Sequence, residues 1–296
     1  MKQFFITDSL YKKVLSESVK SRIERAILSI AIISFLAHLL TICLVHYDVI
    51  NFDTSSNFFE SPIAAIYTPF SFILVYEVYL LIFYLPRSIT TYIGKQYEII
   101  TLIVIRRLFK DLSNLELSSN WFDIKNDLNF TYDILTALLL FFMIYMFSLE
   151  RQKLQKVNAN KFSVEQIEQF IKIKKTMASL LIPVFMIIAG YTLVNWIFNT
   201  SPSDIPVSLK DINSLFFDEF FTVLIIVDVL LLLFSFFYTD RFHKVIRNSG
   251  FVVSTILIRL SFSVDGLINN SLILASIAFG LLILWIHNRF ENNIID

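Results

Sequence analysis

The segment "VYEVYLLIF" at residues 75–83 carries a glutamate, Glu77, inside a run of apolar side chains. A similar segment, "IVDVLLLLF" at residues 226–234, carries Asp228 at the matching position, 151 residues later. Runs this apolar are typical of helices that lie in lipid, where a central carboxylate costs on the order of 3 kcal/mol. The two segments therefore indicate a membrane protein, and the two acids are its first candidate functional residues.

The composition of the whole chain supports the same conclusion. Of its 296 residues, 56% are hydrophobic and 17% are charged, against roughly 25% charged in an average soluble domain. A soluble protein of this size cannot hide so much apolar surface. The net charge of zero gives no reason to expect nucleic acid as a partner, and the single cysteine, Cys43, excludes an internal disulfide. We expect a protein that works within the lipid bilayer.

Crossing the hydrocarbon takes about 20 apolar residues. Six runs qualify, at residues 26–45, 63–85, 130–148, 176–198, 220–238 and 267–287. Segments 88–109 and 241–262 are ambiguous, because charged residues interrupt them. With the N-terminus inside and both segments crossing, nineteen Lys and Arg lie on the cytoplasmic side and six outside; with neither crossing, the counts are fourteen and eleven. Because Lys and Arg favour cytoplasmic loops, the sequence predicts eight transmembrane helices with both termini cytoplasmic.

The eight spans divide into two similar halves, residues 1–149 and 150–296. Besides the two acids, "TLIVIR" at residues 101–106 is echoed by "TILIR" at residues 255–259. Four spans return the chain to its starting side, so the halves should have the same orientation, which is the parallel kind of repeat found in transporters.

Each half also begins with a Lys-rich amphipathic segment, residues 8–25 and residues 163–175, as expected for helices lying on a cytoplasmic leaflet. The predicted fold class is therefore an all-α polytopic membrane protein. It consists of two parallel four-helix repeats, each preceded by an amphipathic interfacial helix.

The surroundings of Glu77 follow from folding the second and third spans as a hairpin, which brings Lys95 and Glu98 level with it. One interpretation is a structural ion pair between Glu77 and Lys95 that lets the hairpin insert. The other places Glu77 and Glu98 on an ion pathway. Both interpretations stay open at this point.

The same folding places Asp228 opposite Ser254 and Thr255, which offer hydroxyl groups and no cation. Asp228 is therefore the better candidate for an acid that is protonated at rest or that binds a passing cation. The alternative is a neutral, structural aspartic acid, hydrogen-bonded to a neighbouring helix.

At the outer end we expect equivalent ion pairs in the two halves. Arg106 and Arg107 should lie near Glu60, and Arg259 should lie near Asp218 and Glu219. For Arg107 and Lys110, snorkelling to the outer headgroups is the alternative.

The leading hypothesis is an integral membrane ion channel or ion-coupled transporter for protons or monovalent cations, with its pathway at the interface of the halves. The alternative is a non-conducting scaffold or sensor subunit, whose amphipathic helices bind a cytoplasmic partner or lipid; a homo-oligomer also fits. The sequence has no clustered nucleophile or metal-ligand set, so we expect no enzyme, catalytic residue, metal or cofactor. The residue usage, rich in Asn, Ile, Lys and Phe, favours a bacterial inner (cytoplasmic) membrane.

Overall fold

The computed structural model describes residues 11, 13–47, 64–112, 125–158, 164–199, 209–238, 241–264 and 266–293. Within these ranges the chain is helical almost throughout and forms no strand. The long helices are α2 (Glu17–His46), α3 (Tyr67–Tyr84), α4 (Ile89–Leu112), α5 (Lys125–Asn158), α6 (Val164–Asn199), α7 (Leu209–Tyr238), α8 (Phe242–Ser261) and α9 (Gly266–Asn293). A short 3-10 turn, η1 (Ala64–Ile66), precedes α3.

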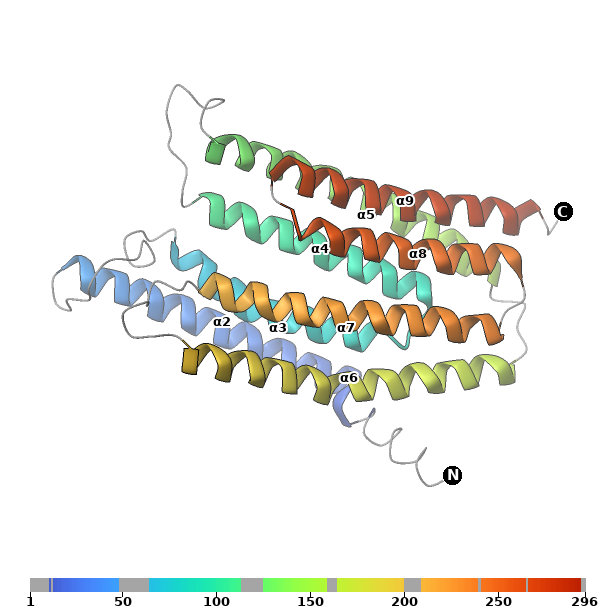
Figure 1. Ribbon diagram of the computed structural model, residues 1–296, viewed down its shortest axis with the longest axis horizontal. Helices are drawn as coiled ribbons and strands as arrows, with labels where there is room; N and C mark the ends of the chain where they lie inside the picture. Colours follow the sequence, from blue (N-terminus) through green and yellow to red (C-terminus); the bar gives the residue numbers. More distant parts are fainter. Residues whose placement is uncertain are drawn as a thin grey trace.

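The long helices run along one common direction, and consecutive helices are antiparallel (Figure 1). In the described part of the chain, five stretches are long and apolar enough to cross a membrane. They are Glu17–His46, Asp127–Lys153, Glu168–Tyr191, Glu219–Tyr238 and Gly266–Asn293. The protein is therefore all-helical in these ranges and has the helices of a membrane-embedded protein, while the number of eight spans stays a prediction.

The two segments that were ambiguous in the sequence form α4 and α8, which carry buried polar residues. The α8 helix buries Asn248, Ser254 and Thr255, and α4 buries Gln96 and Thr101. Helix α8 packs against α9, α7 and α4, and α4 packs against α5, α3 and α8. A helix with neighbours on several sides can be polar, because its side chains find partners within the protein.

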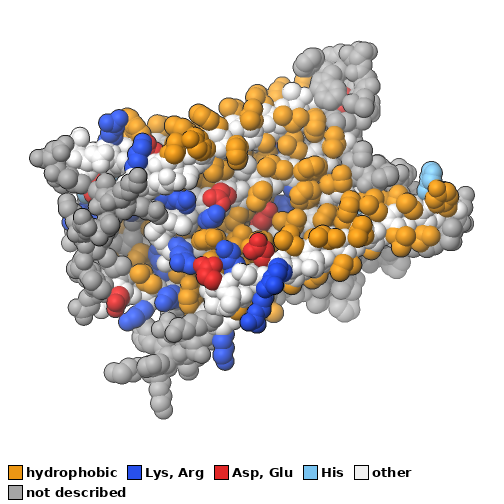
Figure 2. Space-filling view, turned by 180° about the vertical axis from the view of Figure 1, so that it is seen from behind, with side chains coloured by type: hydrophobic (Ala, Val, Ile, Leu, Met, Phe, Trp, Pro, Cys, Tyr) orange, Lys and Arg blue, Asp and Glu red, His pale blue; other side chains and the backbone are white. Residues whose placement is uncertain are grey.

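The outer helices, in contrast, expose large apolar side chains. Ile33 on α2 is 65% exposed and Phe141 on α5 is 70% exposed. Figure 2 shows hydrophobic side chains over much of one face, with charged side chains gathered in its middle and toward one end. This distribution fits a bundle whose apolar outer surface meets lipid.

Packing follows the same order in both halves of the chain. Helix α2 packs on α3, α3 on α4 and α4 on α5, and α6 to α9 repeat this order. The halves meet mainly through α5 and α9, with smaller contacts between α4 and α8 and between α3 and α6. Corresponding helices, such as α2 and α6, run in the same direction (Figure 1). Two parallel repeats would produce this arrangement, and the duplication itself stays a prediction.

The segments expected as separate interfacial helices are separate only in part. Residues 11, 13 and 14 are helical and are followed by a bend at residues 15–16, and the rest, where described, forms the first turns of α2 and α6. Ser16 caps α2 by accepting a hydrogen bond from the Val19 amide at 3.4 Å, and the helix then continues to His46. Neither junction with the apolar part contains Gly or Pro, so the helical hydrogen bonding continues without a break.

Candidate functional site

The carboxylate of Asp228, on α7, is buried between α7 and α4, and the residue is 4% exposed. Gln96 of α4 donates a hydrogen bond from Nε2 to Oδ2 of Asp228 at 3.1 Å. The hydroxyl group of Tyr92, one turn before Gln96, lies near both the Asp228 carboxylate and the Gln96 side chain and interacts with each of them. Two side chains of α4, in the first half of the chain, therefore approach Asp228 in the second half.

A buried cation also acts on Asp228. Lys174 of α6 is 3% exposed and interacts electrostatically with Asp228. Its ammonium donates a hydrogen bond to the backbone carbonyl of Arg87, at 3.0 Å, and lies 4.9 Å from the centre of the Phe170 ring. The surroundings of Asp228 thus differ from those expected from the sequence, which contained hydroxyl groups and no cation.

A small cavity lies beside Asp228, with a volume of about 20 Å³, which is room for about one water molecule. Its polar wall comes from Gln96, Asp228, Thr255 and Arg259. The rest is formed by Leu, Ile and Phe side chains of α3, α4, α7 and α8. The cavity therefore lies where helices of the two halves meet. The predicted approach of Thr255 to Asp228 agrees with this wall.

Glu77, on α3, is 5% exposed, and its Oε2 atom has no hydrogen-bond partner among the described residues. The cation that acts on it is Arg106 of α4. Lys95 instead forms an ion pair with Glu98, one turn along the same helix, on a partly exposed face. Hairpin folding fixes the level of a residue along the helix axis and leaves open which face it occupies, which explains the difference.

The expected outer ion pairs can be followed only in part. Glu60 lies outside the described residues, and so does the side chain of Asp218. Glu219 is exposed, whereas Arg259 is partly buried on the wall of the cavity beside Asp228. The structure therefore brings Arg259 toward the candidate site.

Sequence reasoning missed a polar network that joins the halves. Arg107 of α4 forms an ion pair with Asp133 of α5, with Nη2 and Oδ1 2.8 Å apart. Arg107 also donates from Nη1 to Asn269 of α9 at 2.8 Å, and Asn270 donates to Asp133 at 2.6 Å. The acid near the start of the apolar run 130–148 was the available signal, because a buried Asp needs a partner.

A second missed cluster lies at the opposite end of α8 and α9. The rings of His243 and His287 stack with centroids 5.3 Å apart, and Nε2 of His243 lies 2.9 Å from Oε1 of Glu291. Nη1 of Arg247 lies 3.0 Å from Nε2 of His287. Among the described residues, no group of three or more His, Cys, Asp or Glu side chains could hold a metal ion.

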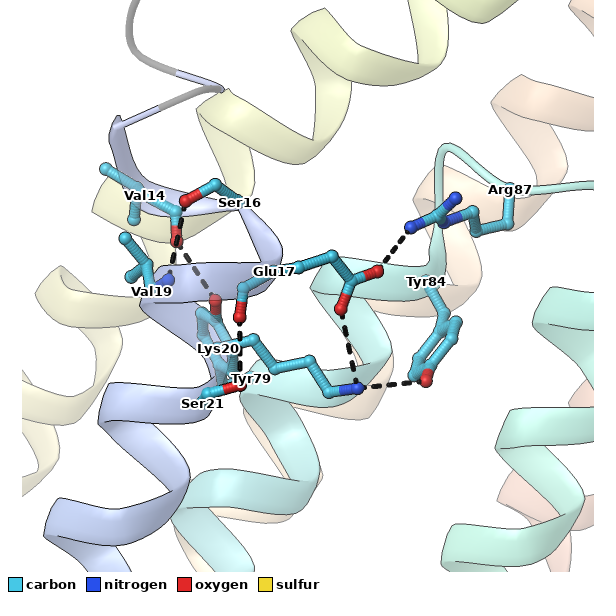
Figure 3. Close-up of polar contacts among 9 residues, drawn as sticks. All are labelled: Val14, Ser16, Glu17, Val19, Lys20, Ser21, Tyr79, Tyr84 and Arg87. Atoms are coloured by element: carbon cyan, nitrogen blue, oxygen red, sulfur yellow. Dashed lines mark hydrogen bonds and ion pairs between the residues drawn. The ribbon is translucent and has the colours of Figure 1, made fainter.

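The turn between α3 and α4 is held from two directions. The Arg87 side chain donates to Glu17 of α2 at 2.7 Å, and Lys20 donates to the Tyr84 hydroxyl at 3.3 Å (Figure 3). The carbonyl of the same Arg87 accepts the hydrogen bond from Lys174. Lys174 thus connects the surroundings of Asp228 to this turn.

Comparisons with known proteins add no function: family models, curated proteins and solved structures all give no match to this chain.

Proposed function

We propose that this protein is an ion-coupled membrane transport protein and that Asp228 is the acid that binds the transported or coupling ion. One observation carries the proposal. A buried carboxylate lies beside a cavity where the halves meet, and a buried lysine from a third helix acts on it. Ionisable groups at membrane depth are costly, so their presence points to a functional role.

The way in which Lys174 and Asp228 are held supports a working site over a structural ion pair. Arg107 and Asp133 bond directly to each other, and amides occupy their remaining positions. Lys174, in contrast, bonds to a backbone carbonyl, and Asp228 receives its hydrogen bond from a neutral amide. An ion can therefore arrive at Asp228 or leave it without the rupture of a direct salt bridge.

The small volume of the cavity favours a transporter over a permanently open channel. A space for about one water, lined mostly by apolar side chains, is not a continuous water-filled pore. In this proposal all eight long helices cross the membrane, and the two halves rearrange around the site to open it alternately to each side. Glu77 occupies the corresponding position in the first half and has a supporting role.

Flux measurements with purified protein in liposomes test the proposal. We expect wild-type liposomes to pass protons or a monovalent cation, and Asp228→Asn to abolish that flux. Glu98→Gln is the matched control, because Glu98 is a carboxylate of a partly exposed ion pair, and it should retain flux. Wild-type liposomes that are tight to all small ions would contradict the proposal.

The second candidate is a non-conducting scaffold or sensor subunit, and the small, mainly apolar cavity favours it. Its docking element would be the beginning of α6, where Ile171 is exposed. In that case the changes Val164→Ser, Ile167→Ser and Ile171→Ser together should remove a co-purifying partner from a folded protein. Asp228→Asn would then alter assembly, and the wild type would show no flux.

A further inference from the structure

We infer that the ion handled at Asp228 is a proton, not a metal cation, and that one water in the adjacent cavity connects Asp228 with Gln96. This inference rests on the proposed function, because it identifies the ion of the same site. It depends on the polar atoms around the cavity, on the cavity volume and on the neighbouring positive charges.

The site has too few oxygen atoms for a metal ion. Hard metal cations in proteins collect about six oxygen ligands or more. On the wall of this cavity the oxygen atoms of side chains come from Asp228, Gln96 and Thr255. Gln96 also directs an N–H donor at Asp228, and that donor would repel a metal cation bound there.

The charges around the carboxylate also oppose a metal cation. Lys174 of α6 acts on Asp228 electrostatically, Arg247 of α8 acts on Lys174, and Arg259 of α8 lies on the cavity wall. From α4, only the neutral side chains of Tyr92 and Gln96 face the acid. A metal ion would therefore be a further positive charge beside a single carboxylate. A proton needs only one lone pair of Asp228 and leaves a neutral acid.

An orphaned atom on the cavity wall marks the place of the water. Oε1 of Gln96 is buried without a hydrogen-bond partner among the described residues, in a side chain that is 5% exposed. Such an atom commonly indicates a bound water. A water in the cavity can donate to Gln96 and to the carboxylate. When the acid ionises, the O–H bond of Asp228 breaks, its electron pair stays on the carboxylate, and the proton moves to this water.

Lys174 acts as a positioning residue in this step. While Asp228 is protonated, the ammonium can stay on the Arg87 carbonyl at the α3–α4 turn. After ionisation the carboxylate attracts it away from that turn. The protonation state of Asp228 therefore affects the hydrogen bond of Lys174 to the α3–α4 turn, which Glu17 also contacts through Arg87. Without the lysine charge the acid keeps its proton at higher pH, so Lys174→Met should move the midpoint of the pH–flux profile to higher pH.

The test imposes a pH gradient on liposomes that contain a pH-sensitive dye, with choline as the only added cation. We expect proton flux that needs neither sodium nor potassium and is lost in Asp228→Asn. Gln96→Leu should lower it by about tenfold or more, because the water loses its anchor. Thr101→Val, a buried change on the same helix that lies off the cavity wall, should keep it.

The failures of the inference and of the proposed function are distinguishable. Flux that requires sodium or potassium and depends on Asp228 overturns the proton assignment and keeps the transport function. Absence of any flux overturns both. An infrared difference spectrum between acidic and alkaline buffers provides a measurement on folded wild-type protein. A protonated-carboxyl band that appears in the wild type and is missing in Asp228→Asn supports the inference. The same band in both proteins contradicts it.

Discussion

Arg107 and Lys174 are both cations on inward-facing sides of their helices, and they differ in how fully their charge is satisfied. The guanidinium of Arg107 contacts Asp133, Asn269 and Asn270 at once. Its planar group of N–H donors fits these three acceptor residues, so few donors remain for a ligand. Lys174 has a single backbone acceptor and a more distant acid. The charge of Arg107 is therefore satisfied by direct contacts, whereas that of Lys174 is satisfied by a backbone carbonyl and a more distant carboxylate.

The structural role of Arg107 predicts a large effect on stability. Arg107→Leu should destabilise the protein by about 3 kcal/mol, because it leaves the buried charge of Asp133 without its partner. Arg107→Leu combined with Asp133→Leu should cost less than the single change. Lys95→Leu, which breaks a partly exposed pair, is the control and should cost about 1 kcal/mol or less. Thermal unfolding of purified protein in detergent compares them, and equal losses for Arg107→Leu and Lys95→Leu would contradict the assignment.

Between elements, the packing of the Tyr97 side chain of α4 against α9 depends on Gly280. A Cβ atom at this position would lie 1.8 Å from the Tyr97 hydroxyl oxygen and 3.2 Å from Oγ of Ser254. Tyr97 is fully buried, and its hydroxyl lies 2.7 Å from that same Oγ. The two halves can thus pack this closely only because position 280 has no side chain.

Gly280→Ala should therefore lower the thermal unfolding midpoint, with a loss of about 1–3 kcal/mol from overpacking. Adding Tyr97→Phe should recover part of the loss, because the clashing hydroxyl is gone. Gly190→Ala on α6 is the control, since a Cβ there meets nothing within 4 Å. It should leave the midpoint unchanged or raise it, as expected for Ala in a helix. A Gly280→Ala protein as stable as the wild type would disprove this packing.

For the whole molecule, the packing order predicts which helix ends share a side of the membrane. The ends of α3 and α7, near Arg87 and Arg241, lie at the same end of the bundle (Figure 1). The opposite end contains Tyr47 and Ser263, which follow α2 and α8. All four side chains are exposed in the described structure.

Cysteine labelling tests this arrangement. In a Cys43→Ala background, cysteines at positions 87 and 241 should react with an impermeant reagent from one side of the membrane. Cysteines at positions 47 and 263 should react from the other side. Labelling of positions 241 and 263 from the same side would mean that α8 does not cross, and the two-repeat arrangement would then fail. A membrane preparation that is lysed before labelling opens both sides to the reagent and provides the control for reactivity at each site.

The sequence by itself determined that the chain is helical and apolar enough for a membrane, where its long helices lie, and that Glu77 and Asp228 fall inside them. These features follow from composition and from runs of apolar residues, which are local properties. The distribution of Lys and Arg also favoured a crossing of the membrane by segments 88–109 and 241–262. These segments form the helices α4 and α8, and their crossing stays a prediction.

Only the tertiary structure decided which side chains meet. A hairpin between neighbouring spans predicts the level of a residue along the axis, and a hairpin of α6 with α7 would have brought Lys174 within reach of Asp228. The rotation of each helix about its axis, however, depends on how side chains of all its neighbours interlock. That rotation placed Gln96 against Asp228 and gave Arg107 its partners on α5 and α9. The pair of Lys95 with Glu98, in contrast, follows from their spacing of three residues on one helix. Interlocking of this kind is a property of the packed bundle and cannot be derived from any single segment.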